Sequence, residues 1–269
     1  MTEVAPPQPP EHQAAVFADA KTEATEMAAS EAEVETVSIV VPARNEEAYV
    51  EGALFSVLGQ QYPLSRLECI VVDNASHDRT AEVVAAFATR HPGLPVLVVS
   101  EPIAGVARAK NRGAAAARGQ ILLFLDADSR MDLGLVRDVA AAYHAGSPAG
   151  SIRVVADSTD LLERGFFELM ELGKLLFGIR TQMLFCDRAL FEELKGFRPE
   201  LRVAEDLEFL KRVSKHLDGK GFGTVCHVRS SAIWTSPRRL RERPYRLSLV
   251  TTFFRWALAF LGIWRSRRY

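Results

Sequence analysis

The stretch ILLFLDAD, residues 121–128, is a wholly apolar run followed at once by two carboxylates one residue apart. A run that is apolar on both faces is typical of a strand covered by helices on both sides of a sheet. In open α/β sheets, ligands bind beyond the carboxyl ends of the strands. The stretch therefore predicts a buried central strand that ends at a ligand site containing Asp126 and Asp128.

Three similar runs precede this strand and alternate with helical stretches. The runs are VSIVV (37–41), CIVV (69–72) and VLVV (96–99), and the helical stretches are 47–60, 80–90 and 106–118. Such alternation predicts parallel strands joined by right-handed crossovers. We therefore expect a doubly wound, mostly parallel α/β sheet flanked by helices.

After Asp128 the pattern is less regular. We expect helices at 133–143, 159–177, 188–194 and 205–217, and strands at 151–155, 181–186 and within the glycine-rich region 219–227. The 269 residues, 48% of them apolar, suit one large domain, which we expect to span 36–241.

The two ends differ from the rest in composition. Residues 1–35 are rich in Ala, Glu and Pro, which predicts a disordered leader. Residues 1–36 carry eight acids and one base, a net of −7, whereas 237–269 carry nine arginines and one glutamate, a net of +8. We expect 242–269 to form a basic, amphipathic helical tail that contacts an anionic membrane surface. The alternatives are a solvated arginine-rich surface and a helix that packs on the domain or on a second subunit.

Composition also excludes several classes of protein. A net charge of −1 argues against a nucleic-acid partner. The three cysteines, Cys69, Cys186 and Cys226, form no CxxC pair, so a zinc ribbon or a redox motif is not expected. No signal-peptide pattern begins the chain, and the apolar segment 247–264 is interrupted by Arg255. We expect a reducing, cytoplasmic location.

Polar side chains follow the first two strands. Asn45 is placed to cap the next helix, and Glu46 and Glu47 then lie in its first turn, where acids favour the helix dipole. Asp73 ends the second strand, where an acid can accept hydrogen bonds from a ribose or a base. We interpret Asp78 as a structural cap.

Two acidic pairs suggest chemistry. Asp126 and Asp128 offer the hard oxygen ligands that Mg²⁺ or Mn²⁺ takes, commonly shared with substrate phosphates; the alternative is a pair of turn acids. Glu205 and Asp206 open a predicted helix, where one of them can act as a general base or both can simply favour the helix dipole.

Basic residues and one histidine complete the candidates. Arg108 and Asn111 share a helix face, with a solvated basic face as the alternative. Arg238 and Arg239 follow Ser236 and are able to clamp phosphate. His227 is able to bind a metal, but a lone histidine is more often structural.

In order and spacing, these motifs resemble glycosyltransferase family 2, with a GT-A fold. The matching stretches are VSIVVPARNEE, CIVVDNASHDRT, AGVARAKNRGAAAARGQILLFLDADS, KGF and AEDLEF, within residues 37–241. The resemblance implies a metal-assisted, inverting transfer of one sugar from a nucleoside diphosphate sugar, with a UDP-sugar as the default donor. The basic, aromatic tail favours a location peripheral to the inner, cytoplasmic face of a membrane, from which a saccharide or lipid-linked acceptor of the cell envelope would follow.

The resemblance also implies roles for single residues. Pro42, Arg44 and Glu46 would line the nucleotide pocket, Asp73 would contact the base, and Arg108 would face the nucleotide. At the other motifs, Asp126 would hold the ribose, Asp128 the divalent cation, and Asp206 would be the catalytic base, with Glu205 beside it. Ser236, Arg238 and Arg239 resemble a late basic motif near the diphosphate or a lipid phosphate.

Departures from the family and two alternative functions bound this interpretation. The QxxRW motif of processive synthases is absent, the nearest stretch being SPRRLRERPY, which argues for single additions. A nucleotidyltransferase would need a glycine-rich loop after the first strand, where the chain reads Pro42-Ala43-Arg44-Asn45-Glu46. A non-catalytic nucleotide-sugar-binding scaffold is disfavoured by the intact Asp126, Asp128 and Asp206.

Overall fold

The computed structural model describes residues 34–177, 183–201, 204–220 and 225–241. Nearly all of the expected leader (1–35) and all of the expected tail (242–269) lie outside the described residues. The unit Thr36–Tyr269 contains every helix and strand described below.

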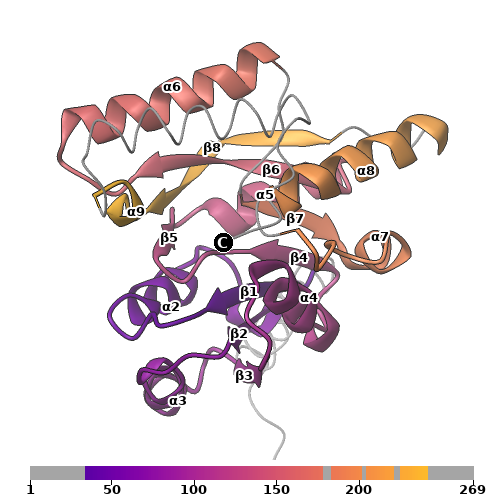
Figure 1. Ribbon diagram of the computed structural model, residues 1–269. Coiled ribbons are helices and arrows are strands. Elements are labelled where there is room, and N and C mark those ends of the chain that lie inside the picture. The colour runs from indigo at the N-terminus through magenta and orange to yellow at the C-terminus, as the bar shows by residue number, and fades with distance from the viewer. Residues whose placement is uncertain (1–33, 178–182, 202–203, 221–224, 242–269) are drawn as a thin grey trace, which may run out of the picture. The chain divides into compact units, whose positions relative to one another are not determined.

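The described strands form one sheet in the order β3-β2-β1-β4-β7-β6-β8-β5 (Figure 1). Their bounds are β1 Val37–Ala43, β2 Leu67–Asp73, β3 Val96–Ser100, β4 Ile121–Phe124, β5 Ser129–Met131, β6 Ala149–Ala156, β7 Leu184–Asp187 and β8 Cys226–Thr235. The helices are α2 Val50–Leu58, α3 Thr80–Arg90, α4 Val106–Ala116, α5 Leu135–His144, α6 Leu161–Phe177, α7 Arg188–Glu193, α8 Glu205–Lys220 and α9 Arg238–Arg241, with a short 3₁₀ turn at Leu64–Arg66.

The central strands are buried on both faces because helices cover both sides. On β1, Ile39 and Val41 pack in one core with α2, α3 and α5, whereas Val40 packs in a second core with α4, α7 and α8. On β4, Leu123 and Phe124 divide between the two cores in the same way. Alternate side chains point to opposite faces of a strand, so a continuous apolar run supplies both cores.

The strand order reverses at β1, the kind of position at which α/β proteins form a ligand-binding crevice. β1 pairs in parallel with both β2 and β4, in registers that place Ala43 beside Asp73 and Val40 beside Phe124. The chain runs outward from β1 to β2 and β3 and then returns to the other side of β1 as β4. Ligands bind at such a reversal of strand order, outside the carboxyl ends of the strands.

The second half of the sheet is mixed. β7 runs antiparallel to both β4 and β6, β8 pairs in parallel with β6, and β5 pairs antiparallel with β8. The expected mostly parallel, doubly wound α/β sheet flanked by helices is therefore confirmed for β1–β4, and the later strands add antiparallel pairs.

Most expected elements are present with shifted ends, and three differences are larger. The strand expected within 219–227 begins only at Cys226 and continues to Thr235, whereas Gly219 and Lys220 still belong to α8. The short strand β5 was not expected. The first expected helix, 47–60, begins later, at Val50.

Two glycine substitutions should have opposite effects on stability. A Cβ at Gly113 would lie 2.4 Å from Val40 Cγ1 and 2.9 Å from Val72 Cγ2, whereas at Gly165 it would meet nothing within 4 Å. We expect Gly113→Ala to cost about 1–3 kcal/mol through overpacking. Gly165→Ala should add about 0.5–1 kcal/mol because alanine loses less backbone entropy in a helix. Urea unfolding measures both, and effects of the same sign would contradict this packing of α4 against the sheet.

Candidate functional site

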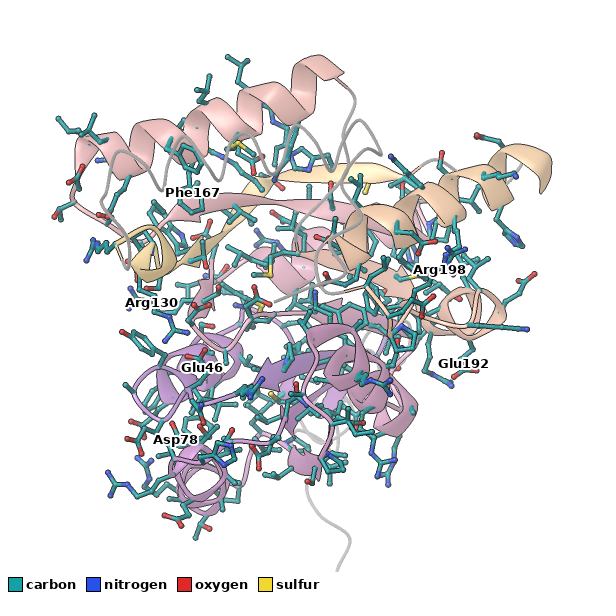
Figure 2. All side chains as sticks on the ribbon, in the orientation of Figure 1. Glu46, Asp78, Arg130, Phe167, Glu192 and Arg198 are labelled. Carbon is teal, nitrogen blue, oxygen red and sulfur yellow. The ribbon has the colours of Figure 1, made fainter. Side chains whose placement is uncertain are left out.

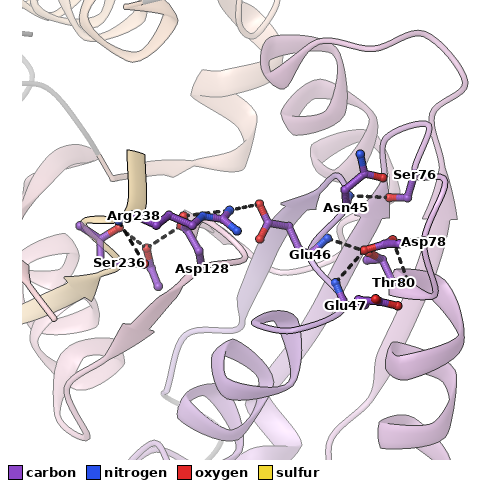
Figure 3. A network of polar contacts seen from close by, with 11 residues as sticks. Asn45, Glu46, Glu47, Ser76, Asp78, Thr80, Asp128, Ser236 and Arg238 are labelled. Atoms are coloured by element: carbon purple, nitrogen blue, oxygen red, sulfur yellow. Dashed lines mark hydrogen bonds and ion pairs between the residues drawn. The ribbon is translucent and has the colours of Figure 1, made fainter. Parts of the chain in front are cut away.

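The loop after β1 is tied to the loop after β2 by side-chain hydrogen bonds (Figure 3). Asn45, in the left-handed region at φ 56°, donates its backbone N–H to Ser76 Oγ (3.1 Å), and its Oδ1 accepts from the His77 backbone N–H (2.8 Å). The Glu46 backbone N–H donates to Thr80 Oγ1 (2.8 Å). The two loops that border the crevice therefore hold each other in place.

Asp78 belongs to this cross-link. Its carboxylate accepts from the backbone N–H groups of Glu47 (3.1 Å) and Thr80 (3.0 Å). Burial raises the pKa of the Asp78 carboxyl, but hydrogen bonds from Thr80 and Glu47 outweigh this and leave the pKa below its ordinary value. This geometry agrees with the structural interpretation of Asp78.

Asp73 lies half-buried at the end of β2, and its neighbour Asn74 connects three segments. Asp73 Oδ1 accepts from the Ser76 backbone N–H at 3.2 Å. Asn74 donates its side-chain amide to the carbonyls of Glu101 (3.1 Å) and Ile103 (2.8 Å), and accepts from the Gly105 N–H (2.8 Å). Asn74 therefore positions the start of α4 beside Asp73, a role that the sequence analysis did not assign.

Arg238 joins the ends of β1 and β4 (Figure 3). Its guanidinium donates to Glu46 Oε1 and lies 3.2 Å from Asp128 Oδ2, and it stacks 4.4 Å from the centre of the Tyr49 ring. The Glu46 and Asp128 side chains are 9% and 5% exposed. Burial lowers the pKa of Arg238, but Glu46 and Asp128 outweigh this and raise it, so the guanidinium stays charged. Three expected site residues thus lie in direct contact.

A second cation, Lys110 on α4, occupies the acidic region between β4 and α8. Lys110 Nζ lies 2.7 Å from Glu205 Oε1, and both side chains are only 9% exposed. Burial lowers the pKa of Lys110, but the charges of Glu205, Asp126 and Asp206 outweigh it and raise this pKa well above its ordinary value. The structure therefore brings Asp126, Glu205 and Asp206 into the neighbourhood of one buried ammonium group.

The residue after Lys110 fastens α4 to the turn before α8. Asn111 donates its side-chain amide to the Phe197 carbonyl (2.8 Å) and accepts from the Phe197 N–H (2.9 Å). Gly196 is in the left-handed region at φ 60°, and a Cβ there would lie 2.6 Å from Asn111 Oδ1. Two adjacent residues of α4 thus anchor both the turn and the first acid of α8.

The remaining expected residues surround the crevice less directly. Pro42 lies on β1 beyond Val40, where the ladder with β4 ends, so its missing N–H costs no bond to β4. Arg44 is exposed in the loop that follows, and Arg108 is half-buried in the first turn of α4.

His227 lies elsewhere, in a buried polar cluster under α6. Its Nδ1 is 2.9 Å from Ser151 Oγ, and its Nε2 is 3.3 Å from Glu171 Oε2. These contacts fit the structural role that a lone histidine more often has.

The sequence analysis did not single out Lys110, although the spacing of its neighbours on α4 marks it as buried. Ala107, Lys110 and Ala114 follow the spacing of a single helix face, and all three are buried. A lysine on a stripe of small buried residues is a candidate for a buried ion pair.

Metal ligands do not gather into a closed cage in the part of the chain that the structure describes. Within it, no three His, Cys, Asp or Glu side chains come together to hold one ion.

The family model described as "Glycosyl transferase family 2" matches residues 38–192, more than half of the chain. This chain belongs to glycosyltransferase family 2. The match covers β1 to β4 and reaches α7, so it includes Asp73, Lys110, Asp126 and Asp128.

Curated relatives agree with this assignment. The chain is 29% identical over 209 residues to a probable glycosyltransferase, YdaM, of Bacillus subtilis, covering 67% of this chain and 47% of that protein. It is 30% identical over 188 residues to the poly(ribitol-phosphate) β-N-acetylglucosaminyltransferase TarS of Staphylococcus aureus, covering 64% of this chain and 31% of the relative. The chain spans about half or less of the length of these relatives.

Solved structures share the fold. TarS (1–349) of Staphylococcus aureus in complex with UDP matches with a TM-score of 0.58 at 21% identity, over 75% of this chain and 60% of that one. The mannosyltransferase PcManGT of Pyrobaculum calidifontis, in complex with GDP-Man and Mn²⁺, matches with a TM-score of 0.59 at 22% identity. This match covers 84% of this chain and 66% of the PcManGT chain. The expected GT-A type fold is confirmed.

Among the helices that the structure describes, none combines the length and apolar character needed to cross a lipid bilayer.

Removal of the Lys110 ammonium should be costly because Glu205, which is 9% exposed, would lose the cation that lies 2.7 Å from it. We expect Lys110→Met to lower the free energy of unfolding by roughly 3 kcal/mol. Arg153 and Glu168 form a matched control, because they also lie 2.7 Å apart but are 37% and 57% exposed. Arg153→Met should cost less than about 1 kcal/mol. Equal losses in urea unfolding would contradict the importance of the Lys110 pair.

Proposed function

We propose that this chain transfers a single sugar from a nucleoside diphosphate sugar to an acceptor hydroxyl by an inverting displacement. One observation supports the proposal: Lys110 pairs with Glu205 at 2.7 Å and also interacts with the charges of Asp126 and Asp206, so the acids after β4 and at the start of α8 belong to one site. An inverting displacement needs a base at one face of the anomeric carbon and charge stabilisation at the leaving diphosphate on the other. Asp206 and the end of β4 are the candidates for these two functions.

The nucleotide half of the site is proposed to lie at the ends of β1, β2 and β4. There Pro42, Arg44 and Glu46 line the pocket, Asp73 contacts the base, and Asp126 holds the ribose. Arg108 on α4 faces the nucleotide, and Arg238 is close to the diphosphate. The structures of TarS with UDP and UDP-GlcNAc and of PcManGT with GDP-Man support a nucleoside diphosphate sugar as donor. A UDP-sugar is our default.

The donor set at Asp128 suits a shared divalent site. Mg²⁺ commonly takes one or two protein carboxylates and completes its shell with substrate phosphates and water. Carboxylates at the end of β4 and the lack of a three-ligand cage within the described ranges fit that pattern. Mg²⁺ or Mn²⁺ held by Asp128 would neutralise charge on the leaving diphosphate. The Mn²⁺ in the PcManGT complex supports this choice.

The base is proposed to be Asp206, with Glu205 as its positioning neighbour. Asp206 is 8% exposed, in the first turn of α8, and its Oδ1 accepts from the Leu207 N–H at 3.0 Å. Lys110 holds Glu205, and Asn111 holds the preceding turn at Phe197, so the Asp206 carboxylate has a supported position. Its task is to take the proton of the acceptor hydroxyl as the new bond forms.

The acceptor is proposed to be a saccharide or a lipid-linked glycan of the cell envelope. The poly(ribitol-phosphate) in the name of TarS, a relative over 64% of this chain, supports a polymeric envelope acceptor. In this proposal residues 36–241 form the catalytic domain and 1–35 a leader. The basic segment 242–269 contacts the inner face of the membrane, from the cytoplasm.

A panel of nucleotides tests the donor site. A ligand that binds only the folded state stabilises it by mass action and so raises the melting temperature. At a ligand concentration one hundred times the Kd, the free energy of unfolding rises by about 2.7 kcal/mol. We expect one of UDP, GDP, dTDP and CDP to raise it, and more so with Mn²⁺. Asp128→Asn should remove the Mn²⁺-dependent part. No rise with any nucleotide would contradict the proposal.

Asp206→Asn tests the base. We expect the release of nucleoside diphosphate from the matching sugar donor to fall by roughly 10²–10⁴-fold, because amides do not accept the proton. Nucleotide binding and the melting temperature should stay unchanged. Asp218, exposed near the other end of α8, supplies the control Asp218→Asn, which should keep full activity. Full turnover by the Asp206 variant would exclude it as the base.

Arg238 should compete with a divalent cation for Asp128 when no diphosphate is present, because its guanidinium lies 3.2 Å from that carboxylate. We expect Arg238→Gln to tighten Mn²⁺ binding to the nucleotide-free protein severalfold and to weaken binding of the nucleoside diphosphate. Isothermal titration calorimetry measures both affinities. Weaker binding of both ligands would mean that Arg238 supports the Asp128 site rather than competing for it.

A further inference from the structure

Helix α6 buries charged side chains and exposes leucines, the reverse of an ordinary surface helix. Glu163 and Lys174 are 1% and 3% exposed, whereas four leucines are between 49% and 79% exposed. They are Leu161, Leu162, Leu169 and Leu172. We call these four the leucine stripe.

The buried charges hold α6 in this orientation. Glu171 accepts from the Val154 N–H of β6 at 3.1 Å, lies 3.3 Å from His227 Nε2 of β8, and pairs with Lys174. Phe167, labelled in Figure 2, packs toward the sheet core. A rotation that buried the leucine stripe would expose Phe167 and break these polar contacts, so the stripe faces outward in the folded protein.

The leucine stripe extends along most of α6 and has few charged neighbours. Leu161, Leu169 and Leu172 are eight and three residues apart, so they follow one side of the helix over about 16 Å. The exposed charges beside them are Arg164 and Glu168. Contiguous exposed apolar surface of this kind marks a contact with a partner or a membrane. In Figure 1, α6 is the outermost element over β6 and β8.

A second observation indicates the partner. Arg241, the last described residue, is anchored at the start of α6 through Glu163, with Nε–Oε1 and Nη2–Oε2 distances of 2.6 and 2.8 Å. The sequence that follows, 242–269, contains six arginines and one glutamate around the apolar, aromatic stretch 247–264. A basic, aromatic segment therefore continues from a point beside the leucine stripe.

We propose that the leucine stripe of α6 docks onto an anionic lipid membrane. Leucines enter the boundary between headgroups and acyl chains, and neighbouring arginines are attracted to anionic headgroups. The exposed leucines, the exposed Arg164 of α6 and Arg241, which is bound at the start of α6, match this chemistry. The inference does not depend on the proposed sugar transfer, although a membrane-bound acceptor would be brought close to the site by it.

The test is co-sedimentation of the full chain with vesicles of phosphatidylcholine and phosphatidylglycerol, compared with vesicles of phosphatidylcholine alone. The variant is Leu169→Gln with Leu172→Gln, which keeps the charge and suits a helix. The control is Leu97→Gln with Ile103→Gln, because these side chains are similarly exposed, at 48% and 55%, and lie on and after β3, at the opposite edge of the sheet.

We expect the wild type to bind the anionic vesicles and the α6 variant to bind them at least about tenfold more weakly, since each buried leucine adds an apolar transfer term. The control should bind like the wild type, and all three proteins should melt at the same temperature without vesicles.

Three outcomes would overturn the proposal. Equal vesicle binding by the α6 variant and the wild type would exclude the leucine stripe as the docking surface, as would no binding by the wild type. A fall of several degrees in the melting temperature of the α6 variant without vesicles would show that the protein itself covers the stripe. The nucleotide-induced rise in melting temperature, measured on the same variant, reports on the donor site separately.

Discussion

Acidic side chains at the end of β4 and at the start of α8 act on the buried ammonium group of Lys110. Lys110 pairs directly with Glu205 at 2.7 Å and also interacts with the charges of Asp126 and Asp206, so it offsets part of the repulsion that burial of these acids brings. The small residues of α4 allow Lys110 to reach this position, because Gly113 and the alanines bring the helix close to β1 and β2. Helix α4 therefore supplies both the close packing against β1 and β2 and the positive charge beside the acids of the site.

Arg238 has the equivalent function on the other side of the crevice. It neutralises Glu46 and Asp128, which belong to segments far apart in the sequence, and its aromatic partner Tyr49 limits where the guanidinium can move. The two cations differ in one respect that bears on function. Lys110 is 7% exposed on a helix packed against the sheet, whereas the Arg238 side chain is 25% exposed on the short helix α9. Arg238 is thus the more accessible of the two cations.

Buried charge pairing also determines the orientation of α6, on the outer face of the domain. Glu171, Lys174 and His227 satisfy one another against β6 and β8, and Lys174 also senses the charge of Asp206. Because these buried charges fix the helix, its leucines remain on the surface. The orientation of α6, and with it the membrane contact that we infer, therefore depends on this buried cluster.

The sequence alone was sufficient for β1 to β4 and for the acids that follow them. Unbroken apolar runs form strands buried on both faces, and residues after parallel strands gather at one edge whatever the later fold. It was not sufficient for β5, a three-residue strand that exists through pairing with β8, or for the end of α8, where Gly219 and Lys220 continue the helix. The contacts of the site depend on tertiary structure for the same reason. Arg238 meets Glu46 across 192 residues and Lys110 meets Glu205 across 95, and no local pattern selects a partner at that separation. Local composition determines which segments become strands, but burial and charge pairing between distant segments decide which side chains meet.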